Sequence, residues 1–170
     1  DNQFLGMLGM HGTYEANNAM HDCDLLINIG ARFDDRITGK IDEFSPKSKK
    51  VHIDIDPSSI NKNVKVDLPI VGDVAAVISS TIKTIKKVKP NFAKSNKQKI
   101  SKWWEKIQKW RSIKSFDFVN STETIKPQYA VQRLYELTKN KDTYITTEVG
   151  QHQMWAAQHY KFDKPNRWMT

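Results

Sequence analysis

The chain has 170 residues, of which 38% are hydrophobic, and its mean hydropathy is −0.64. This length suits one domain or parts of two, and the apolar content is low for a compact domain without indicating disorder throughout. A single cysteine, Cys23, excludes an internal disulfide framework, and no apolar run approaches the roughly 18 residues that cross a bilayer. The net charge of +8 is concentrated in residues 83–114, which hold twelve basic residues against one acid, so the rest of the chain is slightly acidic.

The amino-terminal residues alternate glycine with apolar side chains. Gly6, Gly9 and Gly12 lie among Met and Leu, which excludes a stable helix and suits a loop that packs apolar side chains against a flat ligand. An irregular loop that covers a core is the alternative. A modest helix is expected over residues 14–21, with Thr13 as its candidate cap.

The next stretch combines a predicted strand with a charged loop. The apolar run over residues 25–29, closed by Gly30, predicts a strand buried on both faces of a parallel sheet. The charged residues that follow lie where such a strand ends, and ligands of open α/β sheets bind in the crevice beyond the carboxyl ends of the strands. We therefore expect residues 30–36 to line a site rather than a core. Gly30 allows close approach of a ligand and Gly39 allows a turn at positive φ, whereas a self-neutralising surface loop is the alternative.

A second strand is predicted over residues 51–56, ended by Pro57, which has no amide hydrogen to donate. A carboxylate at the end of a parallel strand is the usual partner of a ribose hydroxyl in dinucleotide-binding folds, which makes Asp54 and Asp56 candidates for a nucleotide sugar. For Asp56 we favour a cap on the turn formed by residues 56–59.

A third strand over residues 68–73 leads into an amphipathic helix over residues 74–87, capped by Asp73. This succession of strands and crossovers is typical of an α/β fold, and right-handed crossovers would put all strand ends on one rim. We expect a partial, Rossmann-like parallel sheet whose remaining strands lie before Asp1. Because the chain starts at Asp1 and stops after an aromatic-rich polar segment with no closing element, we expect an internal fragment of a longer protein.

The basic segment is rich in tryptophan. Its apolar residues recur at spacings of three and four, which predicts a helix with one apolar stripe: Ile100, Trp103, Trp104, Ile107 and Trp110. Lysines interleaved with tryptophans also suit single-stranded nucleic acid, but stacking on bases needs exposed aromatic rings. We favour packing of this helix between domains, with the lysines on its solvated side.

A further α/β unit follows the linker. We expect a helix over residues 127–138, a strand over residues 143–147 and a helix over residues 151–159. A strand, a glycine turn at Gly150 and a helix amino terminus form the geometry of a phosphate site.

No metal motif can be assembled from the histidines, which are scattered: His11, His21, His52, His152 and His159. Each is interpreted as a surface or capping side chain. We find no catalytic motif and expect no metal site within these residues.

The loop over residues 30–40 resembles the flavin-contacting loop of the large, catalytic subunit of acetolactate synthase (acetohydroxyacid synthase), a thiamine-diphosphate-dependent family. The likeness also covers residues 8–12, 51–56, 72–74 and 147–158, whereas residues 89–124 carry no distinctive motif. The resemblance implies the carboxyl-terminal part of a central FAD-binding domain over residues 1–88, a basic, Trp-rich linker over residues 89–124, and the start of a thiamine-diphosphate-binding α/β domain over residues 125–170.

The resemblance also implies binding residues. FAD would contact Leu8, Gly9, Met10, His11, Gly30, Ala31, Arg32, Phe33, Asp34, Asp54, Ile55, Asp73 and Val74. Gln151 and His152 would hold the diphosphate of thiamine diphosphate. Met10, Asp35 and Arg36 would face the substrate channel, where the guanidinium of Arg36 offers a planar fork to the carboxylate of the second 2-keto acid.

The implied reaction decarboxylates pyruvate and joins the resulting enamine to pyruvate or 2-ketobutyrate, in the biosynthesis of branched-chain amino acids. No catalytic residue is expected here: the activating glutamate would lie before Asp1 and the Mg²⁺ ligands beyond Thr170. The 170 residues alone should therefore form no acetolactate.

The expected partners are 2-keto acids, other copies in a dimer or tetramer, and a regulatory small subunit, with no nucleic acid and no membrane. The expected location is the cytoplasm, or the plastid in a plant. Pyruvate oxidase, glyoxylate carboligase and a basic nucleic-acid-binding module are the alternatives.

Overall fold

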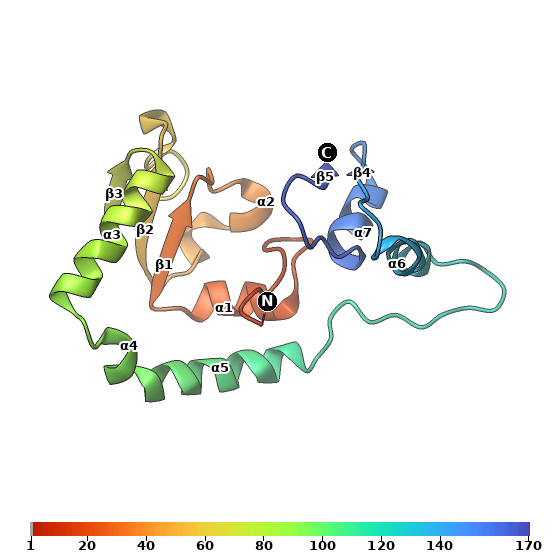
Figure 1. The fold of residues 1–170 in the computed structure, drawn as a ribbon, viewed down its shortest axis with the longest axis horizontal. Coiled ribbons are helices and arrows are strands. Elements are labelled where there is room, and N and C mark those ends of the chain that lie inside the picture. Colours follow the sequence, from red (N-terminus) through yellow and green to blue (C-terminus); the bar gives the residue numbers. More distant parts are fainter. Residues whose placement is uncertain (1) are drawn as a thin grey trace.

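The structure, a computed structural model, describes residues 2–170. Figure 1 shows an N-terminal lobe built on a small sheet, a long helix beneath it, and a C-terminal lobe reached through an extended segment. The N-terminal lobe contains α1 (Tyr14–Asp22), β1 (Leu25–Ile29), α2 (Asp35–Thr38), β2 (Lys49–Asp54), β3 (Leu68–Val71) and α3 (Val74–Val88), with 3₁₀ turns at Ile41–Glu43 and Pro57–Ser59. Next come α4 (Phe92–Ser95) and α5 (Lys97–Arg111), followed by α6 (Pro127–Thr138), β4 (Ile145–Thr146), α7 (Gln151–His159) and β5 (Trp168–Met169).

The three-stranded sheet is parallel, in the order β1-β2-β3, which confirms the predicted α/β class. The strand β2 spans Lys49–Asp54, so it begins and ends two residues earlier than predicted. It ends there because the Asp54 carboxylate accepts the backbone N–H of Asp56 at 2.9 Å, which turns the chain before Pro57. The predicted helix caps are present: Thr13 accepts from Ala16 N–H, and Asp73 accepts from Ala76 N–H.

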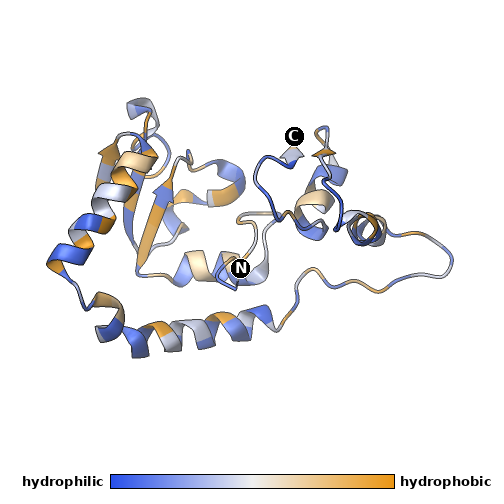
Figure 2. Ribbon diagram, in the orientation of Figure 1, coloured by the Kyte–Doolittle hydropathy of each residue, from blue (hydrophilic) through white to orange (hydrophobic). Residues whose placement is uncertain are grey.

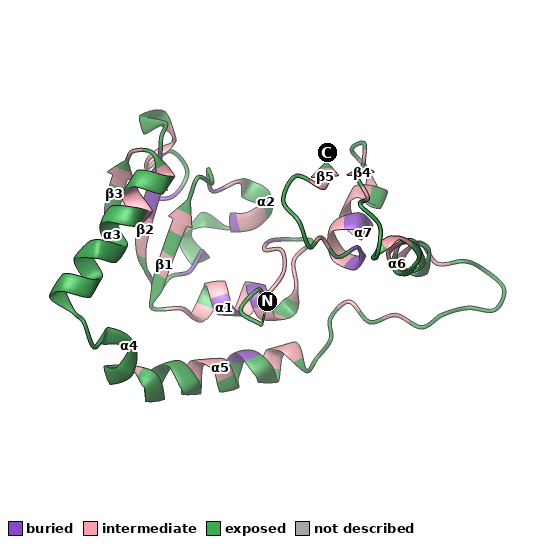
Figure 3. Cartoon of the chain, viewed as in Figure 1, coloured by how far each residue is buried: buried purple, intermediate pink, exposed green. Residues whose placement is uncertain are grey.

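The prediction that β1 is buried on both faces is wrong for this chain. Leu25, Ile27 and Ile29 share one face and are 50%, 51% and 44% exposed. The reason is topological: β1 is an edge strand and α3 packs against β2, so this one apolar face of β1 stays exposed (Figures 2 and 3).

The core of the N-terminal lobe lies on the other face of β1. Phe33, Phe44 and Val64 form a buried cluster, against which Leu26 and Ile37 pack. The rings of Phe33 and Phe44 meet edge to face, with centroids 5.8 Å apart. Phe33, which was expected to line a site rather than a core, is therefore part of this core as well.

The tryptophan helix α5 uses its apolar stripe to pack on α1 of the N-terminal lobe, and its packing between domains stays a prediction. Ile107 is only 2% exposed, and the rings of Trp103 and Trp110 meet edge to face at 5.8 Å. Lys106 bridges the two helices, because its Nζ donates to the Asp22 carboxylate at 2.6 Å. This ion pair lowers the pKa of Asp22, mainly through the Lys106 hydrogen bond.

The C-terminal lobe contains a strand that the sequence did not predict. β5 pairs in parallel with β4, Ile145 lying opposite Trp168, so the expectation of no closing element is wrong. Aromatic contacts bring the chain back: the ring of Phe162 lies 4.9 Å from that of Tyr160 and stacks on Trp168 at 5.4 Å. The short helices α2 and α4 were also not predicted. None of the helices in the described part of the chain is long and apolar enough to span a bilayer.

Replacing Ile107 with Ala should lower the free energy of unfolding by about 2–5 kcal/mol, because it opens a cavity where α5 meets α1. Ile113→Ala is the matched control, since Ile113 is 55% exposed, and should change stability by no more than about 0.5 kcal/mol. Urea denaturation followed by tryptophan fluorescence measures both. Equal losses would contradict the packing of α5 on α1.

Candidate functional site

A cavity of about 600 Å³ opens at the carboxyl ends of β1 and β2. It is lined by Leu8, Met20, Leu26, Ile27, Asn28, Gly30, Ala31, Arg32, Phe33, Asp34, Ile37, Phe44, Asp54 and Ser59. The residues predicted to contact a cofactor include seven of these: Leu8, Gly30, Ala31, Arg32, Phe33, Asp34 and Asp54. An apolar floor with a few polar groups at its rim is typical of cofactor pockets.

The loop after β1 is fixed by side chains that the sequence analysis did not single out. The Asn63 amide donates to the carbonyls of Arg32 and Phe33, both at 3.0 Å, and the Asn28 amide donates to the carbonyl of Ala31 at 2.5 Å. Gly30 has a φ of 64°, and its N–H continues the ladder to Ile53 O at 2.8 Å. The loop backbone is thus held open to the cavity. No sequence pattern marks Asn63, since its partners lie about thirty residues away.

Asp34 sits where the loop becomes α2. Its carboxylate caps α2 by accepting Arg36 N–H at 3.1 Å, and it forms an ion pair with Arg32. The Arg36 N–H lowers the pKa of Asp34 most, followed by a hydrogen bond with Asp35 and then by the charge of Arg32. Asp34 is therefore an anion that both organises the loop and lines the cavity.

The two aspartates after β2 have different surroundings. Asp54 is buried and lines the cavity, and its Oδ1 accepts the Asp56 amide at 2.9 Å. Asp56 accepts from the backbone N–H and the hydroxyl of Ser58, both at 2.8 Å, and the backbone bond is the main cause of its lowered pKa. Asp56 is the turn cap that we favoured, and Asp54 is the carboxylate of the cavity.

His52 lies beneath the cavity and is fully buried, at 0% exposure. Its ring meets the Phe33 ring edge to face at 5.1 Å, and its Nε2 lies 3.6 Å from Asp54 Oδ2. The interpretation of every histidine as a surface or capping residue is wrong for His52 and for buried His159, whose pKa is lowered by burial. His52 packs against the Phe33 ring and His159 against the Phe118 ring, and the sequence alone predicts neither contact.

The loop before α1 contacts the start of α2 through its backbone. Met10 N–H donates to the Arg36 carbonyl at 2.9 Å. Gly9 has a φ of 90°, and a Cβ at this position would lie 2.3 Å from the same Arg36 oxygen. Met10, Asp35 and Arg36 are all exposed, and within residues 2–170 the Arg36 side chain takes part in no ion pair. The structure thus places these three predicted substrate contacts side by side.

Other predicted contacts lie outside the cavity lining. Ile55 is 70% exposed, Asp73 caps α3, and Val74 is the first residue of α3. Gln151 and His152 begin α7 in the C-terminal lobe, where both are exposed and no side chain caps the helix.

The two lobes are linked near the loop before α1. The Gln158 amide of α7 donates to the His11 carbonyl at 3.0 Å. This bond places the C-terminal lobe beside the loop that contains Met10, whose N–H donates to the Arg36 carbonyl.

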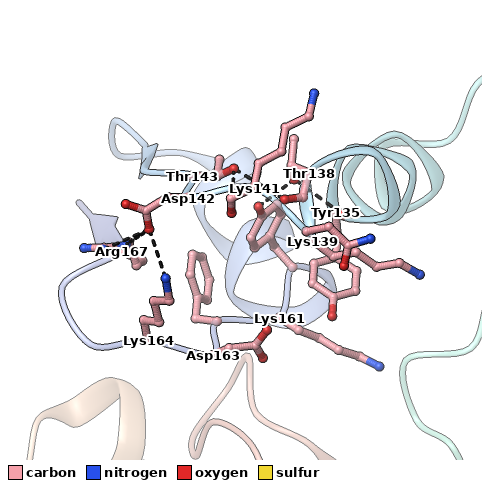
Figure 4. Close-up of a pocket in the computed structure, with 13 residues that line it drawn as sticks. Tyr135, Thr138, Lys139, Lys141, Asp142, Thr143, Lys161, Asp163, Lys164 and Arg167 are labelled. Atoms are coloured by element: carbon pink, nitrogen blue, oxygen red, sulfur yellow. Dashed lines mark hydrogen bonds and ion pairs between the residues drawn. The ribbon is translucent and has the colours of Figure 1, made fainter.

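A second, smaller pocket of about 240 Å³ lies in the C-terminal lobe (Figure 4). At the rim of this pocket, the Asp142 carboxylate forms ion pairs with two basic side chains, with Arg167 at 2.9 Å and with Lys164 at 3.3 Å. These contacts, Arg167 first, lower the pKa of Asp142. They fasten the turn before β4 to the segment that forms β5. Across residues 2–170, no three His, Cys, Asp or Glu side chains gather as a metal site would require.

The sequence matches known proteins over its whole length. The family described as "Thiamine pyrophosphate enzyme, central domain" matches residues 1–81. The acetolactate synthase large subunit of Haemophilus influenzae is 46% identical over 170 residues, which is 100% of this chain and 29% of that protein. The large subunit of isozyme 3 from Escherichia coli is 46% identical over 99% of this chain, and that of Porphyra purpurea is 44% identical over 100%; these matches cover 29% and 28% of the two relatives. The chain therefore spans less than a third of the length of these relatives.

Gly9→Ala should destabilise the protein more than Gly39→Ala. Both glycines have positive φ, which costs an Ala of the order of 1–3 kcal/mol, but only at Gly9 would the new Cβ also meet a backbone carbonyl. Urea denaturation of the two variants measures the difference. Equal destabilisation would contradict the close contact between the loop and Arg36.

Proposed function

We propose that the chain supplies the flavin pocket of an acetolactate synthase large subunit, because residues 1–81 match the central domain of thiamine pyrophosphate enzymes and the chain is 46% identical to two such subunits. The proposed reaction decarboxylates pyruvate and joins the two-carbon unit to a second 2-keto acid. The observation that carries the proposal is the cavity at the carboxyl ends of β1 and β2, whose lining includes seven of the expected cofactor contacts.

The residues of this cavity suit FAD. Gly30 and Ala31 offer an exposed backbone, because a Cβ at Gly30 would meet nothing within 4 Å. Asp54 lies at the end of β2, where a carboxylate can accept a ribose hydroxyl. The floor is apolar, with the side chains of Phe44 and Met20, and apolar walls suit a flat ring system.

The start of α7 suits a diphosphate. Gln151 and His152 lie at a helix amino terminus that carries no capping side chain, so the first amides and the positive end of the helix dipole face outward. We propose that these residues hold thiamine diphosphate, which when bound supplies the nucleophilic carbon and the electron sink of the reaction. The Mg²⁺ that this cofactor requires would take its ligands from outside residues 2–170.

Arg36 is proposed to bind the carboxylate of the acceptor 2-keto acid. Its side chain is exposed and takes part in no ion pair within the described chain, so its guanidinium fork is available to a carboxylate. Asp35 and Met10 would form the adjacent wall of the channel. The hydrogen bond from Met10 N–H to the Arg36 carbonyl holds the backbone from which the Arg36 side chain extends.

We further propose that the protein works as a dimer or tetramer of catalytic subunits with a regulatory small subunit. This proposal comes from the family to which the sequence is similar.

The test of the function is the purified full-length protein supplied with thiamine diphosphate, Mg²⁺ and FAD. It should bind FAD, seen as flavin absorbance that stays with the protein on gel filtration, and convert pyruvate to acetolactate. Hydrogen peroxide as product would indicate a pyruvate oxidase, and tartronate semialdehyde from glyoxylate would indicate a carboligase of that type. A protein that takes up no flavin would contradict the proposal.

Arg36→Ala in the same protein should raise KM for the acceptor 2-keto acid about 10- to 100-fold, the loss expected for a charged hydrogen-bonded pair. FAD affinity should stay unchanged, because Arg36 does not line the cavity. Arg133→Ala, at an exposed position on α6, is the matched control and should alter neither quantity. An unchanged KM in Arg36→Ala would remove the assigned role.

A further inference from the structure

His52 is a buried polar side chain without a hydrogen-bonding partner. Its exposure is 0%, and neither ring nitrogen has a hydrogen bond to any described residue. Buried polar groups are nearly always paired, because removing them from water without a partner costs free energy. An unpaired imidazole directly beneath a cavity therefore needs an explanation from the function of that cavity.

The neighbours of His52 on the sheet form no hydrogen bond with it. The register places Asn28 of β1 and Pro69 of β3 beside it. The Asn28 amide is already bonded to the Ala31 carbonyl, and Pro69 has no amide hydrogen. The Phe33 ring covers the imidazole edge to face and offers it no hydrogen-bonding atom.

An oxygen of Asp54 lies close to the imidazole. His52 Nε2 lies 3.6 Å from Asp54 Oδ2, just beyond hydrogen-bond distance. The other oxygen, Oδ1, is occupied by the Asp56 amide at 2.9 Å. Since Asp54 lines the cavity, Oδ2 is the oxygen left for a ligand, and it has lone pairs for two donors.

We propose that His52 is a positioning residue for the nucleotide half of the cofactor, an inference that rests on the proposed flavin pocket. When a ribose hydroxyl donates to Asp54 Oδ2, the Nε2–H of His52 closes the 3.6 Å gap and donates to the same oxygen. The carboxylate is then held between the Asp56 amide and the imidazole. His52 touches no ligand, and it acts by fixing the direction in which Asp54 presents its free oxygen.

The test compares side chains that can and cannot reach Asp54. In Gln the amide nitrogen takes the place of Nε2, whereas in Asn it takes the place of Nδ1 and falls short. His52→Gln should therefore bind ADP and FAD within about threefold of wild type, and His52→Asn about tenfold more weakly, a free-energy difference of about 1.4 kcal/mol. Isothermal titration of the full-length protein with ADP, and flavin fluorescence with FAD, measure these affinities without turnover.

Two further variants separate positioning from packing. His52→Leu keeps the volume and removes the unpaired nitrogens, so its melting temperature should match or exceed that of wild type while its ADP affinity falls about tenfold. His21→Leu, at an exposed histidine, is the control and should leave ADP affinity unchanged.

The outcomes separate this inference from the proposed function. Wild type that binds ADP and FAD, with His52→Asn and His52→Leu binding equally well, overturns the positioning role and leaves the flavin pocket standing. Equal weakening by Gln and Asn also overturns it, because it indicates packing alone. Wild type that binds neither ligand overturns the proposed pocket and this inference together.

Discussion

The parallel pairing of β1 with β2 is the constraint on which the rest of the structure depends. It aligns Ile29 with Ile53, and the Gly30 amide extends the ladder by donating to the Ile53 carbonyl at 2.8 Å. Because both strands run the same way, the loop after Gly30 and the carboxylate of Asp54 emerge at one edge. A shift of one residue would turn Asp54 to the other face and remove His52 from beneath Phe33.

Local patterns were sufficient to predict most elements of this fold. The spacing of apolar residues predicted α3 and α6 nearly to their ends and predicted that α5 is a helix, and Thr13 and Asp73 marked the start of helices through their side-chain caps. The charged loop between Gly30 and Gly39 was placed at the cavity for a reason that needs no tertiary information, namely that it follows a parallel strand.

Features that depend on distant partners could not be predicted in this way. The burial of His52 follows from the position of Phe33, and the strand β5 follows from the packing of Phe162 on Trp168. The exposure of β1 follows from its place at the sheet edge, since its apolar run suits a central strand equally well. Asn63 holds two carbonyls of the loop from thirty residues away, a contact that leaves no local pattern.

The loop before α1 connects the proposed functional parts of the molecule. Leu8 lines the cavity, Met10 N–H is bonded to the Arg36 carbonyl, and the next carbonyl, that of His11, accepts the Gln158 amide of α7. Four consecutive residues thus touch the proposed flavin pocket, the proposed acceptor arginine and the helix proposed to hold thiamine diphosphate. Gly9 leaves no room for a Cβ against the Arg36 carbonyl, so the loop packs directly on the backbone of α2. The relative position of the two proposed cofactor sites would therefore depend on this one loop, through the Met10 backbone bond to Arg36 and the Gln158 side-chain bond to His11.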